Sequence, residues 1–246
     1  MVRWSVAMAA LVVSARCAVL SFAPPPRRTF FTALRRALAA PAPAAVEEEV
    51  DPGEVAGLRI VKYPHPALRA ANAEVPKEEV KGLADLSKRM FELMYEAQGV
   101  GLAAPQVGVN KRVMVFNPEG AKEKWLDEVV FINPQIVAAS EGMDGAEEGC
   151  LSFPGMGGAV SRHKWVKVQG LNLKGKPIKK KYTGWTARIF QHEYDHLDGV
   201  CYVDRLGDRD RETIAPDLAA LADDYGDGGA EDLLDRDSIE PHVKAD

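Results

Sequence analysis

Cysteine is scarce in this chain of 246 residues, which contains only Cys17, Cys150 and Cys201. So few thiols provide no disulfide framework, and the fold must therefore depend on a hydrophobic core, as in proteins of reducing compartments. The apolar runs are also short, since none reaches the roughly 20 residues that span a bilayer. We therefore expect no membrane anchor in the mature form.

Acidic residues are missing from residues 1–46, although this segment contains six arginines. Its beginning is similar to a short signal peptide, and the part from Phe22 to Val46 is rich in arginine and alanine. Such two-part segments resemble the presequences that deliver proteins to plastids bounded by extra membranes. We expect residues 1–46 to be a bipartite targeting presequence, with the plastid (chloroplast stroma) as destination and the mitochondrion as the alternative.

The other 200 residues are acidic, with 25 basic and 36 acidic side chains. This balance argues against direct binding of nucleic acid. We divide this part of the chain into a linker at 47–57, one catalytic domain at 58–207, and an acidic C-terminal helix with a mobile tail at 208–246. A domain of about 150 residues is large enough to bury a sizeable core.

Hydrophobic periodicity predicts both helices and strands in this domain. Apolar residues at helical spacing predict an amphipathic helix over 75–97 and a further helix around 214–224. Apolar and β-branched runs predict strands, at 112–116, 129–137, 165–173 and 178–182. Strands bracketed by helices favour the α+β class, with largely antiparallel sheets around a central helix.

The strongest chemical signal is the run HEYDH at residues 192–196. One helical turn separates His192 from His196, so both imidazoles lie on one face of a helix with Glu193 beside them. Thr183 as an N-cap and Gly199 as a stop support this helix. Two neutral nitrogen ligands beside a carboxylate have the composition expected of metal-assisted hydrolysis. The alternative is a pair of buried core histidines in a chance pattern.

A catalytic site of this kind needs a third protein ligand, because three ligands and one open position are usual. Metalloproteases with a histidine three residues after the glycine do not fit, since that position is Tyr202. An acidic ligand at Glu212 or near Asp223 lacks a surrounding motif. Cys150 remains, just before a turn marked by proline and glycine, and metal ligation is favoured there over a role as nucleophile.

Three motifs together resemble the peptide deformylase family: GVGLAAPQ at 99–106, EGCLS at 148–152 and QHEYDH at 191–196. The likeness extends from about Leu58 to Leu206. It implies an α+β domain with peptide deformylase activity, which hydrolyses the formyl amide on the N-terminal methionine of new organellar proteins. Its partners would be formyl-methionyl nascent peptides and, transiently, the ribosome. A general metalloprotease and a non-catalytic, metal-stabilised binding domain are the alternatives.

The resemblance also implies the ligands of a metal ion. Cys150, His192 and His196 would bind one divalent ion, which is iron(II) in the cell, with zinc or another divalent ion able to occupy the same ligands. Glu193 would act as general base and general acid toward the metal-bound water and the departing amine.

The remaining site residues follow from the same resemblance. The side-chain amide of Gln106 and the backbone N–H of Leu151 would stabilise the oxyanion. The substrate would contact the residues around these groups, which are Val100, Gly101, Glu148, Gly149, Trp185, Arg188 and Ile189. Gly157 and Gly158 depart from the family, whose members have a larger side chain here. We expect a looser flank that changes peptide affinity more than the chemical step.

Overall fold

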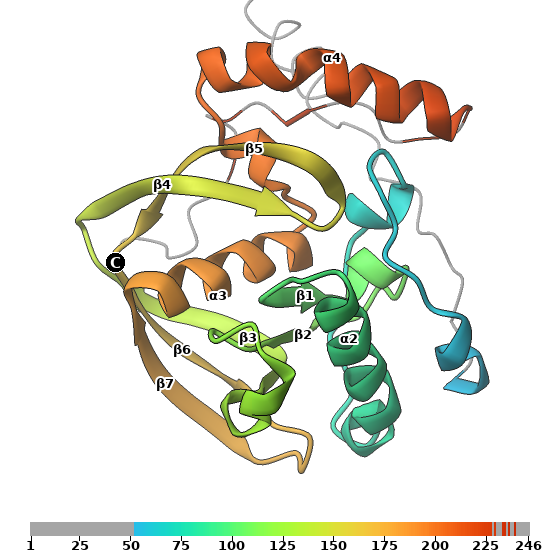
Figure 1. The fold of residues 1–246 in the computed structure, drawn as a ribbon. Coiled ribbons are helices and arrows are strands. Elements are labelled where there is room, and N and C mark those ends of the chain that lie inside the picture. The colour runs from blue at the N-terminus through green and yellow to red at the C-terminus, as the bar shows by residue number, and fades with distance from the viewer. Residues whose placement is uncertain (1–51, 228, 230–232, 235, 237–238, 240–246) are drawn as a thin grey trace, which may run out of the picture. The chain divides into compact units, whose positions relative to one another are not determined.

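The computed structural model describes residues 52–227, 229, 233–234, 236 and 239, which all belong to one compact unit (Figure 1). The expected presequence and most of the expected tail lie outside these residues. The second half of the expected linker forms a short 3-10 helix, η1 (Pro52–Gly57). The domain boundaries at residues 46, 57 and 207 stay predictions. Among the described helices, none combines the length and apolar composition of a membrane span.

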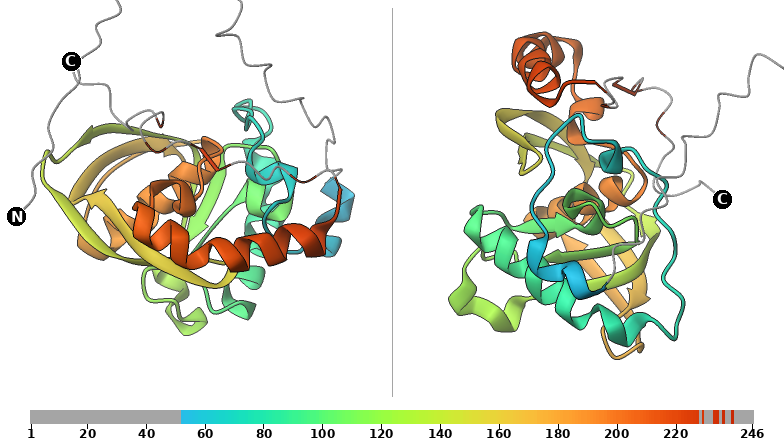
Figure 2. Two further views of the ribbon diagram at one scale, coloured as in Figure 1. Left: turned by 90° about the horizontal axis from the view of Figure 1, so that it is seen from above. Right: turned by 90° about the vertical axis from the view of Figure 1, so that its right-hand side faces the viewer.

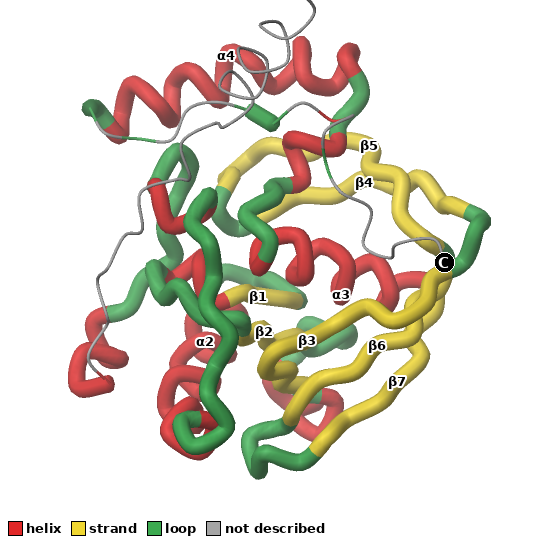
Figure 3. The backbone as a smooth tube through the Cα atoms, turned by 180° about the vertical axis from the view of Figure 1, so that it is seen from behind, coloured by secondary structure: helices red, strands yellow, loops and turns green. Residues whose placement is uncertain are grey.

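The strands described by the structure form two antiparallel sheets, so the α+β class is confirmed. The larger sheet has the strand order β1, β2, β3, β6, β7, and the smaller sheet is the hairpin of β4 and β5 (Figures 1 and 3). The strands are β1 (Gly101–Ala103), β2 (Val113–Phe116), β3 (Val129–Ala139), β4 (Met143–Cys150), β5 (Phe153–His163), β6 (Trp165–Leu171) and β7 (Pro177–Thr183). Sequence analysis did not predict β1, β4 and β5, because their many glycines hide the strand pattern.

Helices α2 (Ala84–Glu96) and α3 (Gly184–Leu197) cover opposite faces of the larger sheet. Successive side chains of β2 alternate between the two cores: Val113 and Val115 pack with α2, whereas Met114 packs with α3. Side chains of a strand point alternately to its two faces, so the two helices lie on different sides. This arrangement buries α3 deeply in the domain.

The predicted helix at 75–97 is wrong at its start. Helix α2 begins at Ala84 and follows a 3-10 turn, η3 (Val80–Leu83). The reason lies at Val75, whose backbone N–H and C=O both bind the side chain of Asn133, at 2.9 Å each. These bonds attach the segment before η3 to β3, so its backbone groups are satisfied without a helix.

The β4–β5 hairpin lies on the side of α3 away from the larger sheet, and α4 (Asp208–Tyr225) runs across β5 (Figures 1 and 2). Asp210 of α4 accepts a hydrogen bond from the Ala159 N–H at 3.0 Å. A Cβ added to Gly158 would lie 2.6 Å from Leu206 Cδ2. The expectation of a loose flank is therefore wrong at Gly158, because this glycine allows close packing of the chain that leads into α4.

Candidate active site

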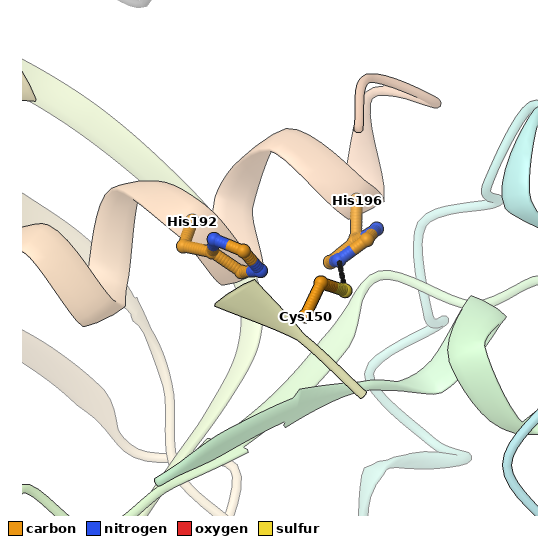
Figure 4. Close-up of side chains that lie close together, drawn as sticks. All are labelled: Cys150, His192 and His196. Atoms are coloured by element: carbon orange, nitrogen blue, oxygen red, sulfur yellow. Dashed lines mark hydrogen bonds between the residues drawn. The ribbon is translucent and has the colours of Figure 1, made fainter. Parts of the chain in front are cut away.

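The three predicted metal ligands meet where the β4–β5 hairpin approaches α3 (Figure 4). Cys150 is the last residue of β4, and His192 and His196 lie one turn apart on α3. Cys150 Sγ is 3.3 Å from His196 Nε2, and one ligand atom from each residue lies within 4.8 Å of the others. Ligand atoms 2.0 to 2.3 Å from one tetrahedral ion are roughly 3.5 Å apart. Small shifts would therefore place all three around a single ion.

The sequence of α3 directs the two histidines toward the hairpin because the other side of the helix is apolar. Ile189, Phe190 and Leu197 are buried in the core between α3 and the larger sheet. A helix fixed by that face presents its other face to the hairpin. Thr183 occupies the predicted N-cap position without a side-chain capping bond, and Gly199 follows the end of α3 at φ +71°.

Glu148 orients His192. One carboxylate oxygen, Oε2, lies 3.0 Å from His192 Nδ1 and also accepts a bond from Arg162 at 2.8 Å. The other oxygen accepts bonds from Arg162 at 2.9 Å and Arg188 at 2.7 Å. Burial opposes ionisation of Glu148, but the charge of Arg162 and the bond to His192 hold its pKa well below the usual range. An ionised Glu148 that accepts a hydrogen bond from Nδ1–H leaves His192 Nε2 available as a ligand.

The electrostatics of the cluster favour a cation. Burial by itself lowers the pKa of His192, but its contacts with Cys150 and Glu148 raise that pKa well above the ordinary value. Burial and the charge of His192 lower the pKa of His196 well below its ordinary value. The cluster thus stabilises positive charge beside a neutral imidazole. A divalent cation that replaces the His192 proton fits this donor set.

A buried network of ion pairs joins α3 to the hairpin behind the ligands. Arg162, on β5, donates to Asp195 as well as to Glu148. Arg205 binds Asp195 through two bonds, of 2.6 and 2.5 Å. Burial opposes the charge of Arg162, but Asp195 and Glu148 raise its pKa, so it stays a cation. Each buried charge has a partner, which is the condition for a stable network.

Glu193 lies beside the ligands and against β1. Its carboxyl group is buried, and burial raises its pKa to about 7. One oxygen, Oε2, has no hydrogen-bond partner among the described residues. Gly101 leaves the space that this side chain fills, because a Cβ added there would lie 2.8 Å from Glu193 Cδ. A carboxyl group with a pKa near neutrality is suited to accept and return a proton.

The side chain of Gln106 is oriented by the backbone of β1. The Ala103 N–H donates to Gln106 Oε1 at 2.8 Å, and Gln106 Nε2 lies 3.3 Å from both Cys150 Sγ and Ser152 Oγ. Because its oxygen is engaged, the amide presents its N–H groups to Cys150 and Ser152. Leu151 follows Cys150 in the tight turn between β4 and β5. The two predicted oxyanion donors thus belong to neighbouring segments.

A cavity of about 620 Å³ opens onto these groups. Every predicted site residue lines it except His196, which is buried behind the wall. The lining residues that were predicted are Val100, Gly101, Gln106, Glu148, Gly149, Cys150, Leu151, Trp185, Arg188, Ile189, His192 and Glu193. The structure thus brings the predicted residues together, while their individual roles stay predictions.

Two of the predicted substrate contacts use their charged groups inside the protein. Glu148 binds the network described above. The Arg188 guanidinium donates to Glu148 and to the backbone oxygens of Val160 and Asp144, at 2.7, 2.8 and 2.6 Å. Only the aliphatic stem of Arg188 is therefore available to a ligand. Trp185 is 54% exposed, and its Nε1 donates to the Pro118 oxygen at 3.1 Å, so the indole is fixed beside the cavity.

Sequence analysis missed three residues that shape the site. Phe153 and Met156 of β5 line the cavity, and their position directly after the cysteine motif was the available signal. Arg162 was missed because its carboxylate partners are distant in sequence. Its signal is an arginine directly after a run of small and apolar residues, since a buried guanidinium requires carboxylate partners.

Comparison with known proteins agrees with this geometry. Residues 58–212 match the family model of polypeptide deformylase. Peptide deformylase 1B, chloroplastic, from Oryza sativa subsp. japonica is 42% identical over 183 residues, which cover 74% of this chain and 66% of the relative. Peptide deformylase 1B, chloroplastic/mitochondrial, from Arabidopsis thaliana is 43% identical over 68% of this chain and 61% of the relative. The chain spans less than two thirds of the length of either relative.

Solved structures give the same result. The crystal structure of a plant peptide deformylase 1B superimposes with a TM-score of 0.65 at 42% identity and covers 68% of this chain and 90% of the plant chain. Peptide deformylase from Plasmodium falciparum superimposes with a TM-score of 0.64 at 41% identity, over 68% of this chain and 96% of the other.

Proposed function

This chain belongs to the polypeptide deformylase family, and we propose on that basis that it removes the formyl group from the N-terminal formyl-methionine of newly made proteins. The reaction breaks the C–N bond between the formyl carbon and the methionine nitrogen, adds water, and yields formate and a free amine. The observation that carries the proposal is the convergence of Cys150, His192 and His196 beside one cavity that Glu193 and Gln106 line.

We place one divalent metal ion between Cys150, His192 and His196. The negative surroundings that raise the pKa of His192 support this assignment, and one sulfur with two imidazoles suits iron(II) or zinc. Iron(II) is the ion that we propose for the cell. When bound, the ion would activate a water molecule and polarise the formyl carbonyl group.

Glu193 is proposed to move the protons of the reaction. Its unpartnered oxygen accepts a proton from the attacking water, and the same carboxyl group then delivers that proton to the departing methionine nitrogen. A pKa of about 7, which results from burial, suits both steps near neutral pH. Glu193 therefore serves first as base and then as acid.

Gln106 and the Leu151 backbone are proposed to stabilise the negative oxygen of the tetrahedral intermediate. The Gln106 N–H groups are already directed toward Cys150 by the bond from Ala103 to its oxygen. A donor oriented before the reaction needs no rearrangement when the charge develops. Removal of one such donor typically lowers the rate by about 10²- to 10³-fold.

The peptide is proposed to bind between two strand edges. Strand β1 is the edge of the larger sheet, and β4 is a strand of the small hairpin. Val100 and Gly101 on one side and Glu148 and Gly149 on the other line the cavity, so an extended peptide can pair with their backbones. The methionine side chain would then contact the apolar wall formed by Ile189, Trp185 and the Arg188 stem.

The test is anaerobic release of formate from a formyl-Met-Ala-Ser peptide by the iron-loaded protein, beside the variant Glu193→Gln. This substitution preserves side-chain size and all three ligands, so we expect equal metal content and a loss of formate release of about 10²- to 10⁴-fold. Glu147→Gln is the matched control, because Glu147 is an exposed carboxylate on the same cavity wall. Equal activity of the Glu193→Gln variant, or no formate from a metal-loaded parent, contradicts the proposal.

Cleavage of internal bonds in an unformylated peptide would instead identify a general metalloprotease, the alternative that the HEYDH helix leaves open.

We further propose that the protein acts in the plastid, with the mitochondrion as the alternative. The names of the rice and Arabidopsis relatives support this pair of destinations.

A further inference from the structure

After residue 46, positive charge is concentrated in one stretch of this acidic chain. Residues 149–192 contain no aspartate or glutamate, although the whole chain has 36. Seven exposed lysines lie there: Lys164, Lys167, Lys174, Lys176, Lys179, Lys180 and Lys181. Within the described part of the chain, none of the seven is ion-paired with a carboxylate. This stretch therefore carries uncompensated positive charge.

Strand pairing gathers three of these lysines on one face of the larger sheet. Lys167 of β6 lies directly opposite Lys181 of β7, and Lys179 lies opposite Gln169. The ammonium groups of Lys181 and Lys167 lie 4.6 and 5.9 Å from the centre of the Trp165 ring, so all three side chains are on the same side. We call Trp165, Lys167, Gln169, Lys179 and Lys181 the basic sheet face.

The basic sheet face points away from α3. The alternate residues of the same strands, Val166, Val168 and Tyr182, pack into the core beneath that helix. Side chains alternate across a strand, so the lysines occupy the outer side. Figure 3 shows β3, β6 and β7 side by side, and the three lysine side chains are exposed. The face is thus open to a partner.

Protection of the sheet edge does not account for this arrangement. Lysines on an edge strand oppose edge-to-edge aggregation, and β7 is an edge strand. Lys167, however, is on β6, which is paired on both sides. Like charges directly opposite one another in a sheet are destabilising. The Lys167 and Lys181 pair therefore has a cost that an anionic partner would offset.

We propose that the basic sheet face binds the phosphodiester backbone of single-stranded RNA. Three lysines on one face can pair with phosphates of such a backbone, and Trp165 and Gln169 add an aromatic ring and an amide that bases can contact. The overall acidity of the chain argues against broad nucleic-acid binding, whereas this face is a local exception.

The test compares two triple variants of the full chain, Lys167→Gln/Lys179→Gln/Lys181→Gln and Lys77→Gln/Lys81→Gln/Lys88→Gln. The second set consists of exposed lysines at and before α2, and it removes the same charge. Fluorescence anisotropy would follow a labelled single-stranded RNA of mixed sequence from about 50 to 200 mM salt. The matched control is necessary because residues 1–46 carry six arginines that can also attract RNA.

We expect the affinity of the first variant for RNA to be at least tenfold lower than that of the parent at low salt. The slope of log affinity against log salt should also become smaller by about 2, because each of the three lost phosphate contacts contributes about 0.7. The control variant should match the parent, and all three should unfold at the same temperature. Equal affinity for a DNA strand of the same sequence would show that the phosphates are recognised. Higher affinity for RNA than for DNA would show that the 2′-hydroxyl groups are recognised as well. Equal losses in both variants, no RNA binding, or binding to anionic vesicles in place of RNA would each overturn the proposal.

Discussion

Gly101 has no side chain, and the carboxyl group of Glu193 fills the space that a Cβ at this position would occupy. The glycine of the GVGLAAPQ motif therefore has a role that its sequence context did not reveal. Sequence analysis placed Gly101 against the substrate, and the structure adds a contact with the proposed base. A neighbouring glycine, Gly99, similarly leaves room for the Leu151 side chain, since an added Cβ would lie 2.7 Å from Leu151 Cδ1.

Gly101→Ala should displace Glu193 and slow formate release by about 10²-fold, because a misplacement of roughly 1 Å in a reacting group has an effect of that size. Metal content should be unchanged. Gly82→Ala is the control, since nothing lies within 4 Å of a Cβ added to Gly82. Steady-state kinetics of the two variants checks this, and equal rates would show that Glu193 does not depend on Gly101.

Cys201 predicts how stability depends on pH. Burial raises the pKa of this thiol above its ordinary value of 9.0, so the unfolded chain loses the proton before the folded protein does. The associated stability is fully present below about pH 9 and is lost as pH rises further. The parent should therefore lose free energy of unfolding between about pH 8 and pH 10. The Cys201→Ala variant lacks the thiol, and its loss over the same range should be smaller by about 1.4 kcal/mol. Urea unfolding at the two pH values measures this, and parallel losses would contradict it.

At the scale of elements, a network of buried ions joins the hairpin to α3. Strands β4 and β5 pair with each other and with no strand of the larger sheet. Arg162 connects β5 to α3 through Asp195 and to β4 through Glu148, whose carboxylate in turn contacts His192. The position of Cys150 relative to the histidines therefore depends on this network.

Arg162→Gln should lower the free energy of unfolding by about 3 to 5 kcal/mol, because it leaves the buried Glu148 and Asp195 charges without their shared partner. Arg89→Gln is the matched control. Its ion pairs with Glu92 and Glu96 are partly exposed and should contribute less than about 1 kcal/mol. Chemical denaturation of both variants is the measurement. A loss in Arg162→Gln no larger than that in the control would mean that the network does not stabilise the fold.

At the scale of the whole molecule, the sequence predicted contacts that lie within a motif better than contacts between motifs. The pairing of His192 with His196 could be predicted from their spacing within one motif, whereas Cys150 was assigned to them through the resemblance to the family. The bonds from Arg162 to Asp195 and from Asn133 to Val75 could not, since they join segments that only the folded chain brings together. Strands with regular alternation were found within two residues of their observed ends, whereas the glycine-rich β4 and β5 were not.

The targeting prediction concerns residues outside the described part of the chain. Residues 1–46 fused to a fluorescent protein should direct it into plastids, and the same segment with its six arginines changed to glutamine should not, because the acid-free positive charge is the feature that resembles a presequence. Microscopy with plastid and mitochondrial markers distinguishes the two destinations. If the fusion protein with the unchanged segment spread evenly through the cytosol, the result would contradict this prediction.

The order of the ligands along the chain has a consequence for synthesis of the protein. Cys150 is made first, and the whole of β5, β6 and β7 must follow before α3 supplies His192 and His196. A growing chain that ends before residue 196 therefore contains only part of the proposed ligand set. The proposed metal could bind all three residues only after translation has passed α3, so the proposed activity would be absent during most of the protein's own synthesis.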